Sequence, residues 1–133
     1  MIKILLVEDS KFLRLATERA LSRAGYAMSS ASDGEEALTL AREKLPDLIL
    51  LDMLLPKMSG PDVLAALKKD PVTKAIPVFV LSGLSEKNAA RLRGDGADGF
   101  LEKGALELNK GADKLLTAVR QIVEKLPRAA PAN

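Results

Sequence analysis

The residues best suited to chemistry in this chain are carboxylates that follow short apolar segments. Glu8 and Asp9 come directly after one such segment, and Asp52 ends the apolar run 48–51. An apolar run that closes on a carboxylate is typical of a buried strand whose last residue reaches the edge of a sheet. On this stretch alone, the simpler interpretation is that Asp52 is a turn residue ahead of Pro56.

The composition excludes several classes of chemistry. The chain has 133 residues and contains neither cysteine nor histidine. Disulfides, thiol nucleophiles, histidine-based triads, histidine zinc sites and a histidine phosphocarrier role are therefore excluded for this sequence. Lys and Arg total 20 and Asp and Glu total 18, and a net charge of +2 is too weak to predict nucleic acid or an acidic membrane as a partner. Carboxylates, lysines and hydroxyl groups must supply any chemistry.

The length fits one domain with a buried core. The first apolar segment meets Glu8 and Asp9 too early for a signal peptide, and no apolar run approaches membrane-spanning length. We therefore expect a cytoplasmic protein without a membrane partner. Residues 1–126 are predicted to form the domain, and the Pro/Ala-rich residues 127–133 a disordered tail or the remnant of a linker.

Short apolar runs alternate with helical patterns along the chain. Strands are expected at residues 2–7, 26–31, 48–51, 77–81 and 99–102. Helices are expected at about 10–24, 34–45, 60–70 and 86–93, with a last one that starts late, between 109 and 112, and runs to 126. The buried face of the first helix is expected to comprise Leu13, Ala16, Ala20, Leu21 and Ala24. This alternation predicts an α/β fold, a parallel sheet with helices on both faces.

Polar residues gather where the expected strands end. Glu8 and Asp9, Asp52, Ser82 and Lys103 close or follow four of the five strands, and sites in parallel sheets form at that edge. Neighbouring carboxylates repel one another unless a cation lies among them, and oxygen ligands suit a hard cation, Mg²⁺ or alternatively Mn²⁺. A metal and a lysine around a free carboxylate predict a cradle for a phosphoryl group, with the carboxylate as nucleophile.

Each of these residues also has a simpler interpretation. Glu8 and Asp9 could cap the first helix, where negative charge is favourable. Lys103 could be a solvated lysine, Ser82 a turn residue and Phe100 part of the core. The coincidence of the whole set at one edge favours the functional interpretation.

The set and its order resemble the response-regulator receiver domains of two-component signalling, the CheY-like superfamily. The resemblance covers roughly residues 2–126 and rests on Glu8-Asp9, on residues 52–60, on Ser82 and on residues 96–103. It implies a flavodoxin-like (βα)5 three-layer sandwich with sheet order 2-1-3-4-5. It also implies a phosphoacceptor signalling domain rather than an enzyme, although one able to assist its own phosphorylation and dephosphorylation.

The resemblance implies a role for each matching residue. Asp52 is the phosphoacceptor, Lys103 contacts the phosphoryl group, Ser82 is the switch hydroxyl and Phe100 the aromatic ring that turns inward with it. The implied ligands of Mg²⁺ or Mn²⁺ are Glu8, Asp9, Asp52 and the backbone carbonyl of Leu54. The implied output face, formed by the fourth helix, the fifth strand and the last helix, includes Lys87, Arg91 and Phe100.

The implied function is a switch. A sensor histidine kinase or phosphotransfer protein would phosphorylate Asp52, and the output face would then contact a downstream protein, with no nucleic acid expected. Two alternatives stay open. The chain could be a receiver-shaped interaction module that works without phosphorylation, or a receiver excised from a larger hybrid kinase or DNA-binding regulator.

The sequence departs from the family pattern after Lys103. Gly104 stands where receivers usually have proline, and residues 104–111 form a longer connection than usual. The missing proline favours a less firmly placed lysine, and the two departures together favour the interaction module that works without phosphorylation. Leu54 and Leu84 are apolar, two residues after Asp52 and Ser82, at positions that flank the attacking water in receivers. We predict that this pair disfavours water and prolongs the phosphorylated state.

Two other motifs do not fit. The segment 94–99 matches G-x-G-x-x-G, but it follows a helix and leads into a strand, the reverse of a dinucleotide site. An aspartyl-phosphatase of the haloacid-dehalogenase type needs a second aspartate two residues after the first, and this chain has Leu54 there.

Overall fold

A parallel sheet of five strands forms the centre of the computed structural model, which describes residues 1–52, 58–82, 96–102 and 113–126. The strands are β1 (Lys3–Val7), β2 (Ala27–Ala31), β3 (Leu48–Asp52), β4 (Val78–Ser82) and β5 (Gly99–Glu102). Their order in the sheet is β2-β1-β3-β4-β5, which confirms the predicted order 2-1-3-4-5.

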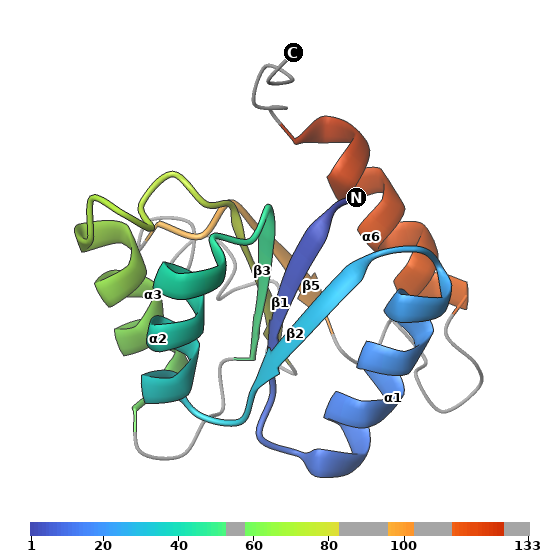
Figure 1. Cartoon of the computed structure of the whole chain (residues 1–133), viewed down its shortest axis with the longest axis horizontal. Coiled ribbons are helices and arrows are strands. Elements are labelled where there is room, and N and C mark those ends of the chain that lie inside the picture. The colour runs from blue at the N-terminus through green and yellow to red at the C-terminus, as the bar shows by residue number, and fades with distance from the viewer. Residues whose placement is uncertain (53–57, 83–95, 103–112, 127–133) are drawn as a thin grey trace.

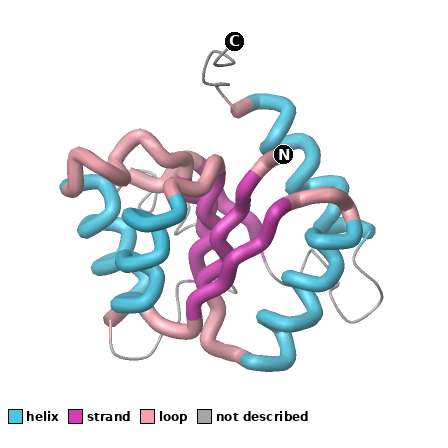
Figure 2. The backbone as a smooth tube through the Cα atoms, in the orientation of Figure 1, coloured by secondary structure: helices cyan, strands magenta, loops and turns pink. Residues whose placement is uncertain are grey.

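Helices cover both faces of this sheet. The described helices are α1 (Lys11–Arg23), α2 (Gly34–Lys44), α3 (Gly60–Lys69) and α6 (Asp113–Lys125). Figure 1 shows α2 and α3 together on one face and α1 and α6 on the other, and Figure 2 shows the sheet as the middle layer. The predicted three-layer α/β architecture is therefore confirmed. The helix expected at 86–93 and the tail 127–133 lie outside the described residues.

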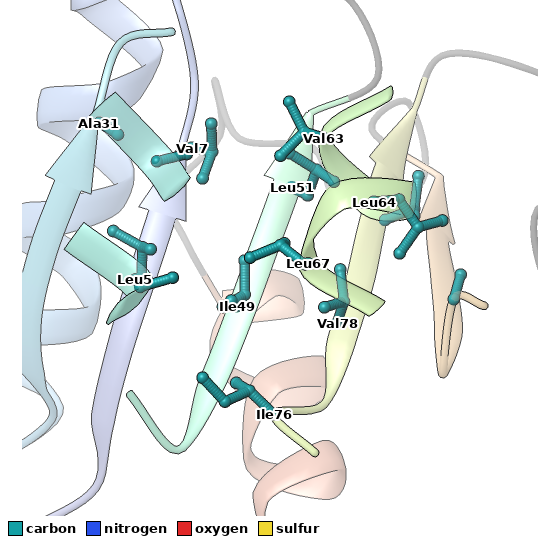
Figure 3. Packing of buried hydrophobic residues seen from close by; sticks show 14 residues of the cluster. Leu5, Val7, Ala31, Ile49, Leu51, Val63, Leu64, Leu67, Ile76 and Val78 are labelled. Atoms are coloured by element: carbon teal, nitrogen blue, oxygen red, sulfur yellow. The ribbon is translucent and has the colours of Figure 1, made fainter. Parts of the chain in front are cut away.

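The central strands β1 and β3 are almost entirely apolar because both of their faces are buried. In β1, Leu5 and Val7 pack in a cluster with α2 and α3, whereas Ile4 and Leu6 pack in a second cluster with α1 and α6 (Figure 3 shows the first cluster). The strand β3 alternates in the same way. Apolar side chains on both sides hold each strand in register, and that register fixes where the strand ends.

Three helices begin on side-chain caps shortly after a strand ends. The side chain of Ser10 accepts a hydrogen bond from the Leu13 amide, Asp33 does so for Glu36, and Ser59 does so for Asp62. Each cap satisfies an amide that has no partner within its helix. The caps therefore fix the chain at the edge of the sheet where the polar residues gather.

The buried face of α1 differs from the expected one. Leu21 is buried as expected, but Ala16 and Ala24 are exposed and Thr17 is buried instead. Thr17 and Leu21 are four residues apart and so lie on one side of the helix. The helix is thus rotated so that Thr17, rather than the alanine beside it, is buried. The predicted stop is confirmed, because Gly25 follows the helix with a φ of +102°.

Close packing at the start of β5 generates a test of the fold. Gly99 pairs with Phe79 of β4, and a Cβ atom at Gly99 would overlap the phenyl ring. We expect Gly99→Ala to lower the free energy of unfolding by about 1–3 kcal/mol, because the ring must move out of its packed position. Chemical denaturation measures this loss. The double variant Gly99→Ala, Phe79→Leu should lose less than the sum of the two single changes, and strict additivity would contradict the account.

Candidate functional site

The strand register brings the first and third strands to the same level. Val7 pairs with Leu51, so Glu8 and Asp52, the next residue of each strand path, stand side by side at the carboxyl edge. Asp52 pairs in turn with Leu81 of β4. Glu8 and Asp52 are far apart in the sequence, yet they are neighbours at the edge of the sheet. The pairing of the apolar strands β1 and β3 brings them together, rather than any contact between the two acids.

The acidic residues form one cluster at this edge. Glu8, Asp9 and Asp52 each offer a carboxylate oxygen, and these oxygens all lie within 4.8 Å of one another. Glu8 and Asp52 are buried, with exposed fractions of 3% and 2%, whereas Asp9 is exposed. This confirms the expectation that the acids converge. The cluster is open to solvent on the side of Asp9.

Such a cluster is electrostatically costly without a cation. Two unit charges 4.8 Å apart repel by about 3 kcal/mol at an effective dielectric constant near 20. The buried positions of Glu8 and Asp52 reduce screening by water. A divalent ion among the three oxygens would turn this repulsion into attraction.

The donor set and its spacing fit a small, hard cation. An octahedral ion with oxygens at about 2.1 Å places its ligands about 3 Å apart when adjacent and about 4 Å apart when opposite. Oxygens within 4.8 Å of one another reach that geometry with small side-chain movements. The site thus contains oxygen donors only, which suits Mg²⁺ or Mn²⁺ better than softer metals. The carbonyl of Leu54, the fourth expected ligand, lies outside the described residues.

The main chain around Glu8 is held by several hydrogen bonds. The Glu8 amide donates to the carbonyl of Ala31 at the end of β2 (3.0 Å), and the Ser10 amide donates to Oε2 of Glu8 (3.2 Å). The cap of α1 is Ser10, whose Oγ accepts from Leu13. Ser10, rather than Glu8 or Asp9, is therefore the N-cap of α1, while the carboxylate of Glu8 accepts from the Ser10 amide and also belongs to the acid cluster.

The remaining predicted residues are placed only in part. Ser82 ends β4 and pairs with Glu102 of β5, so it stands one residue beyond the level of Asp52. Phe100 lies in β5 opposite Val80. Five predicted residues lie outside the described part of the chain: Leu54, Leu84, Lys87, Arg91 and Lys103. Their roles, and those of Ser82 and Phe100, stay predictions.

One residue at the site was not anticipated from the sequence. Arg14 of α1 donates from Nη1 to the carbonyl of Glu8 (3.0 Å) and lies 3.5 Å from the carbonyl of Asp9. A usable signal was its position four residues after the helix cap Ser10, from which a long side chain can reach back over the start of the helix.

Among the described residues, no helix is both long enough and apolar enough to cross a membrane.

Comparison with known proteins identifies relatives of the whole fold. The family model described as "Response regulator receiver domain" matches residues 4–120. A gliding motility regulatory protein from Myxococcus xanthus is 39% identical over 123 residues, which cover 91% of this chain and 15% of that protein. The chain spans between 15% and 52% of the lengths of this and the next three curated relatives.

Solved structures agree with this match. A response regulator from Desulfuromonas acetoxidans superposes with a TM-score of 0.81 at 30% identity, covering 96% of this chain and 100% of that one. The Mn²⁺-bound form of the response regulator Rcp1 superposes with a TM-score of 0.79 at 28% identity, again covering 96% and 100%.

The acid cluster predicts that a divalent cation stabilises the protein. One site occupied at 100 times its dissociation constant adds about 2.7 kcal/mol to the free energy of unfolding. We expect Mg²⁺ to raise the melting temperature of the wild type and to raise that of Asp9→Asn much less, because this change removes one charged ligand.

Thermal unfolding followed by circular dichroism measures both shifts. Glu43→Gln, which removes an exposed acid of α2 outside the cluster, is the matched control and should respond like the wild type. If Mg²⁺ raised the melting temperature of Asp9→Asn as much as that of the wild type, the predicted metal site would be wrong.

Proposed function

Because this chain belongs to the response regulator receiver domain family, we propose that it is a phosphorylation-dependent switch whose phosphoacceptor is Asp52. The observation that carries the proposal is the position of Asp52, which is buried at the carboxyl edge of β3 and within 4.8 Å of the carboxylates of Glu8 and Asp9. The phosphoryl donor in this proposal is a sensor histidine kinase or a phosphotransfer protein.

The proposed reaction transfers a phosphoryl group from an imidazole nitrogen of the donor to a carboxylate oxygen of Asp52. A carboxylate oxygen of Asp52 attacks the phosphorus atom, the new O–P bond forms, and the N–P bond to the donor imidazole breaks with the electron pair on nitrogen. Lys103 pairs with one phosphoryl oxygen, and the hydroxyl of Ser82 donates a hydrogen bond to another. The chain is therefore a signalling domain that contributes to its own modification.

Glu8, Asp9, Asp52 and the carbonyl of Leu54 are the proposed metal ligands. Mg²⁺ or Mn²⁺, when bound, supplies positive charge that offsets the charge of the carboxylates and of the phosphoryl oxygens. The oxygen-only donor set supports this choice, and so does the solved Mn²⁺-bound form of the similar response regulator Rcp1. Within this set, Asp9 is exposed and gives the ion access from solvent.

The signal is proposed to travel along the neighbouring strands β4 and β5. Ser82 ends β4 one residue beyond the level of Asp52, and Phe100 lies opposite Val80 in the paired strand. A phosphoryl group that draws Ser82 and Lys103 inward leaves space that Phe100 fills, which biases a two-state equilibrium. Lys87, Arg91 and Phe100 then present a changed face to a downstream protein.

The alternative of an interaction module that works without phosphorylation has less support. Such a module has no need of buried carboxylates that repel one another, and those are present at this edge. The activities of the longer relatives belong to those proteins, since the chain spans at most about half of their length. The cytoplasmic location stays a prediction.

Covalent phosphorylation is the direct test of the proposal. Incubation with acetyl phosphate and Mg²⁺ should add one phosphate to the wild type and none to Asp52→Ala, as measured by intact-protein mass spectrometry. Beryllofluoride should shift the NMR signals of the wild type and not those of the variant.

The control for this experiment is Asp62→Asn, which removes an exposed aspartate of α3 and should be phosphorylated normally. A wild type that takes no phosphate and shows no response to beryllofluoride would overturn the proposed switch. Equal phosphorylation of Asp52→Ala would overturn the choice of acceptor.

The lifetime of the phosphorylated state gives a further prediction from the sequence. Leu54→Asn should increase the rate of phospho-Asp52 hydrolysis severalfold, because an amide near the acceptor can orient a water that leucine excludes. Loss of phosphate after removal of the donor measures this rate. Leu45→Asn, at an exposed leucine that ends α2, is the control, and an unchanged rate in Leu54→Asn would refute the hypothesis.

A further inference from the structure

We infer that Arg14 is a positioning residue for the acid cluster, one that holds the main chain carrying Glu8 and Asp9 and thereby sets the affinity of the site for a divalent cation. The inference rests on the proposed function, because it assigns a cause to the metal affinity of that same site.

The contacts of Arg14 are concentrated on residues 8–10, the corner of the chain between β1 and α1. Its guanidinium Nη1 donates to the carbonyl of Glu8 at 3.0 Å and lies 3.5 Å from the carbonyl of Asp9. Its own amide donates to the carbonyl of Ser10 at 2.8 Å. The amide bond is the ordinary first bond of the helix, so the side chain itself contacts two consecutive carbonyls, those of the two expected metal ligands.

These bonds complete the attachment of the corner to the rest of the fold. On one side, the Glu8 amide is tied to β2 through the carbonyl of Ala31. On the other side, the carbonyl of the same residue is tied to α1 through Arg14. The peptide groups on both sides of Glu8 are therefore fixed between a strand and a helix. This restraint keeps the side chains of Glu8 and Asp9 near the carboxylate of Asp52.

The corner needs such a restraint because of the charges it carries. Glu8, Asp9 and Asp52 place three like charges within 4.8 Å of one another, and their repulsion favours any movement that takes Asp9 away from the sheet. Asp9 is exposed, so packing does little to prevent that movement. Hydrogen bonds from a charged donor to the backbone of Glu8 and Asp9 oppose it.

An arginine suits this position better than a lysine. Both contacts come from Nη1, whose two N–H bonds have fixed directions in the planar guanidinium fork, whereas an ammonium group is a single point of charge on a flexible stem. Arg14 is partly buried against the corner, which keeps the fork in place. The geometry therefore predicts that a change to lysine, which keeps the charge, loses part of the effect.

The experiment compares Arg14→Gln and Arg14→Lys with the wild type and with Arg19→Gln. Arg19 is an exposed arginine of the same helix, so its change removes the same charge without touching the corner. Titration with Mg²⁺, followed by the amide NMR signals of Asp9 and Asp52, gives the dissociation constant without any activity measurement. The rate of phosphorylation by acetyl phosphate is then measured at limiting and at saturating Mg²⁺.

We expect Arg14→Gln to weaken Mg²⁺ binding about tenfold, the lower end of the effect typical of groups that orient metal ligands. Arg14→Lys should lie between this variant and the wild type, and Arg19→Gln should match the wild type. Because the residue acts on metal affinity, saturating Mg²⁺ should restore most of the phosphorylation rate of both Arg14 variants.

Several results would overturn the inference. One is a dissociation constant of both Arg14 variants equal to that of the wild type. Another is weaker binding that merely follows a loss of folded protein in thermal unfolding, and Arg14→Lys provides this comparison if Arg14→Gln does not fold. If the wild type binds Mg²⁺ and the variants bind it equally well, the role of Arg14 is refuted but the metal site is not. A wild type that binds no Mg²⁺ refutes the metal site of the proposed function together with it.

Discussion

The carboxylates of Glu8, Asp9 and Asp52 place three like charges within 4.8 Å of one another. The core and the bonds around Glu8 hold these side chains together against their repulsion. Apolar strands buried on both faces bring β1 and β3 to the same edge in a fixed register. The cap at Ser10 and the bonds of Arg14 and Ala31 hold the corner that follows β1. The folding energy of the core is thus opposed at one point by charge repulsion, which a divalent cation would relieve.

The amino ends of β4 and β5 are fixed in a different way. Nζ of Lys68 donates to the carbonyl of Ile76 and to Oδ2 of Asp98, both at 3.0 Å, and that same oxygen accepts from the Val78 amide at 2.7 Å. This network joins α3 to the starts of both strands. The two strands are therefore anchored at the edge of the sheet opposite the acids.

Much of this arrangement could be predicted from the sequence, for identifiable reasons. Runs such as 48–51 are apolar at every position because both sheet faces are covered, and a carboxylate that ends such a run must reach the edge. The convergence of Glu8, Asp9 and Asp52 followed from that rule. The rotation of α1 could not be predicted, because Ala16 is small enough to fit either the core or the surface, and Thr17 is buried although threonine is mostly a surface residue. Arg14 was missed because its partners are main-chain carbonyls, which every residue possesses, so that only its position four residues after Ser10 gave a signal.

We propose that a cation held by the acid cluster allows Asp52 to accept a phosphoryl group. The most direct test measures, on one preparation, the rate of phosphorylation by acetyl phosphate and the thermal stabilisation as functions of free Mg²⁺. The account predicts that the rate saturates, that its midpoint coincides with the dissociation constant derived from the stabilisation, and that Asp9→Asn shifts both to higher concentration. A phosphorylation rate that does not depend on the Mg²⁺ concentration would contradict it.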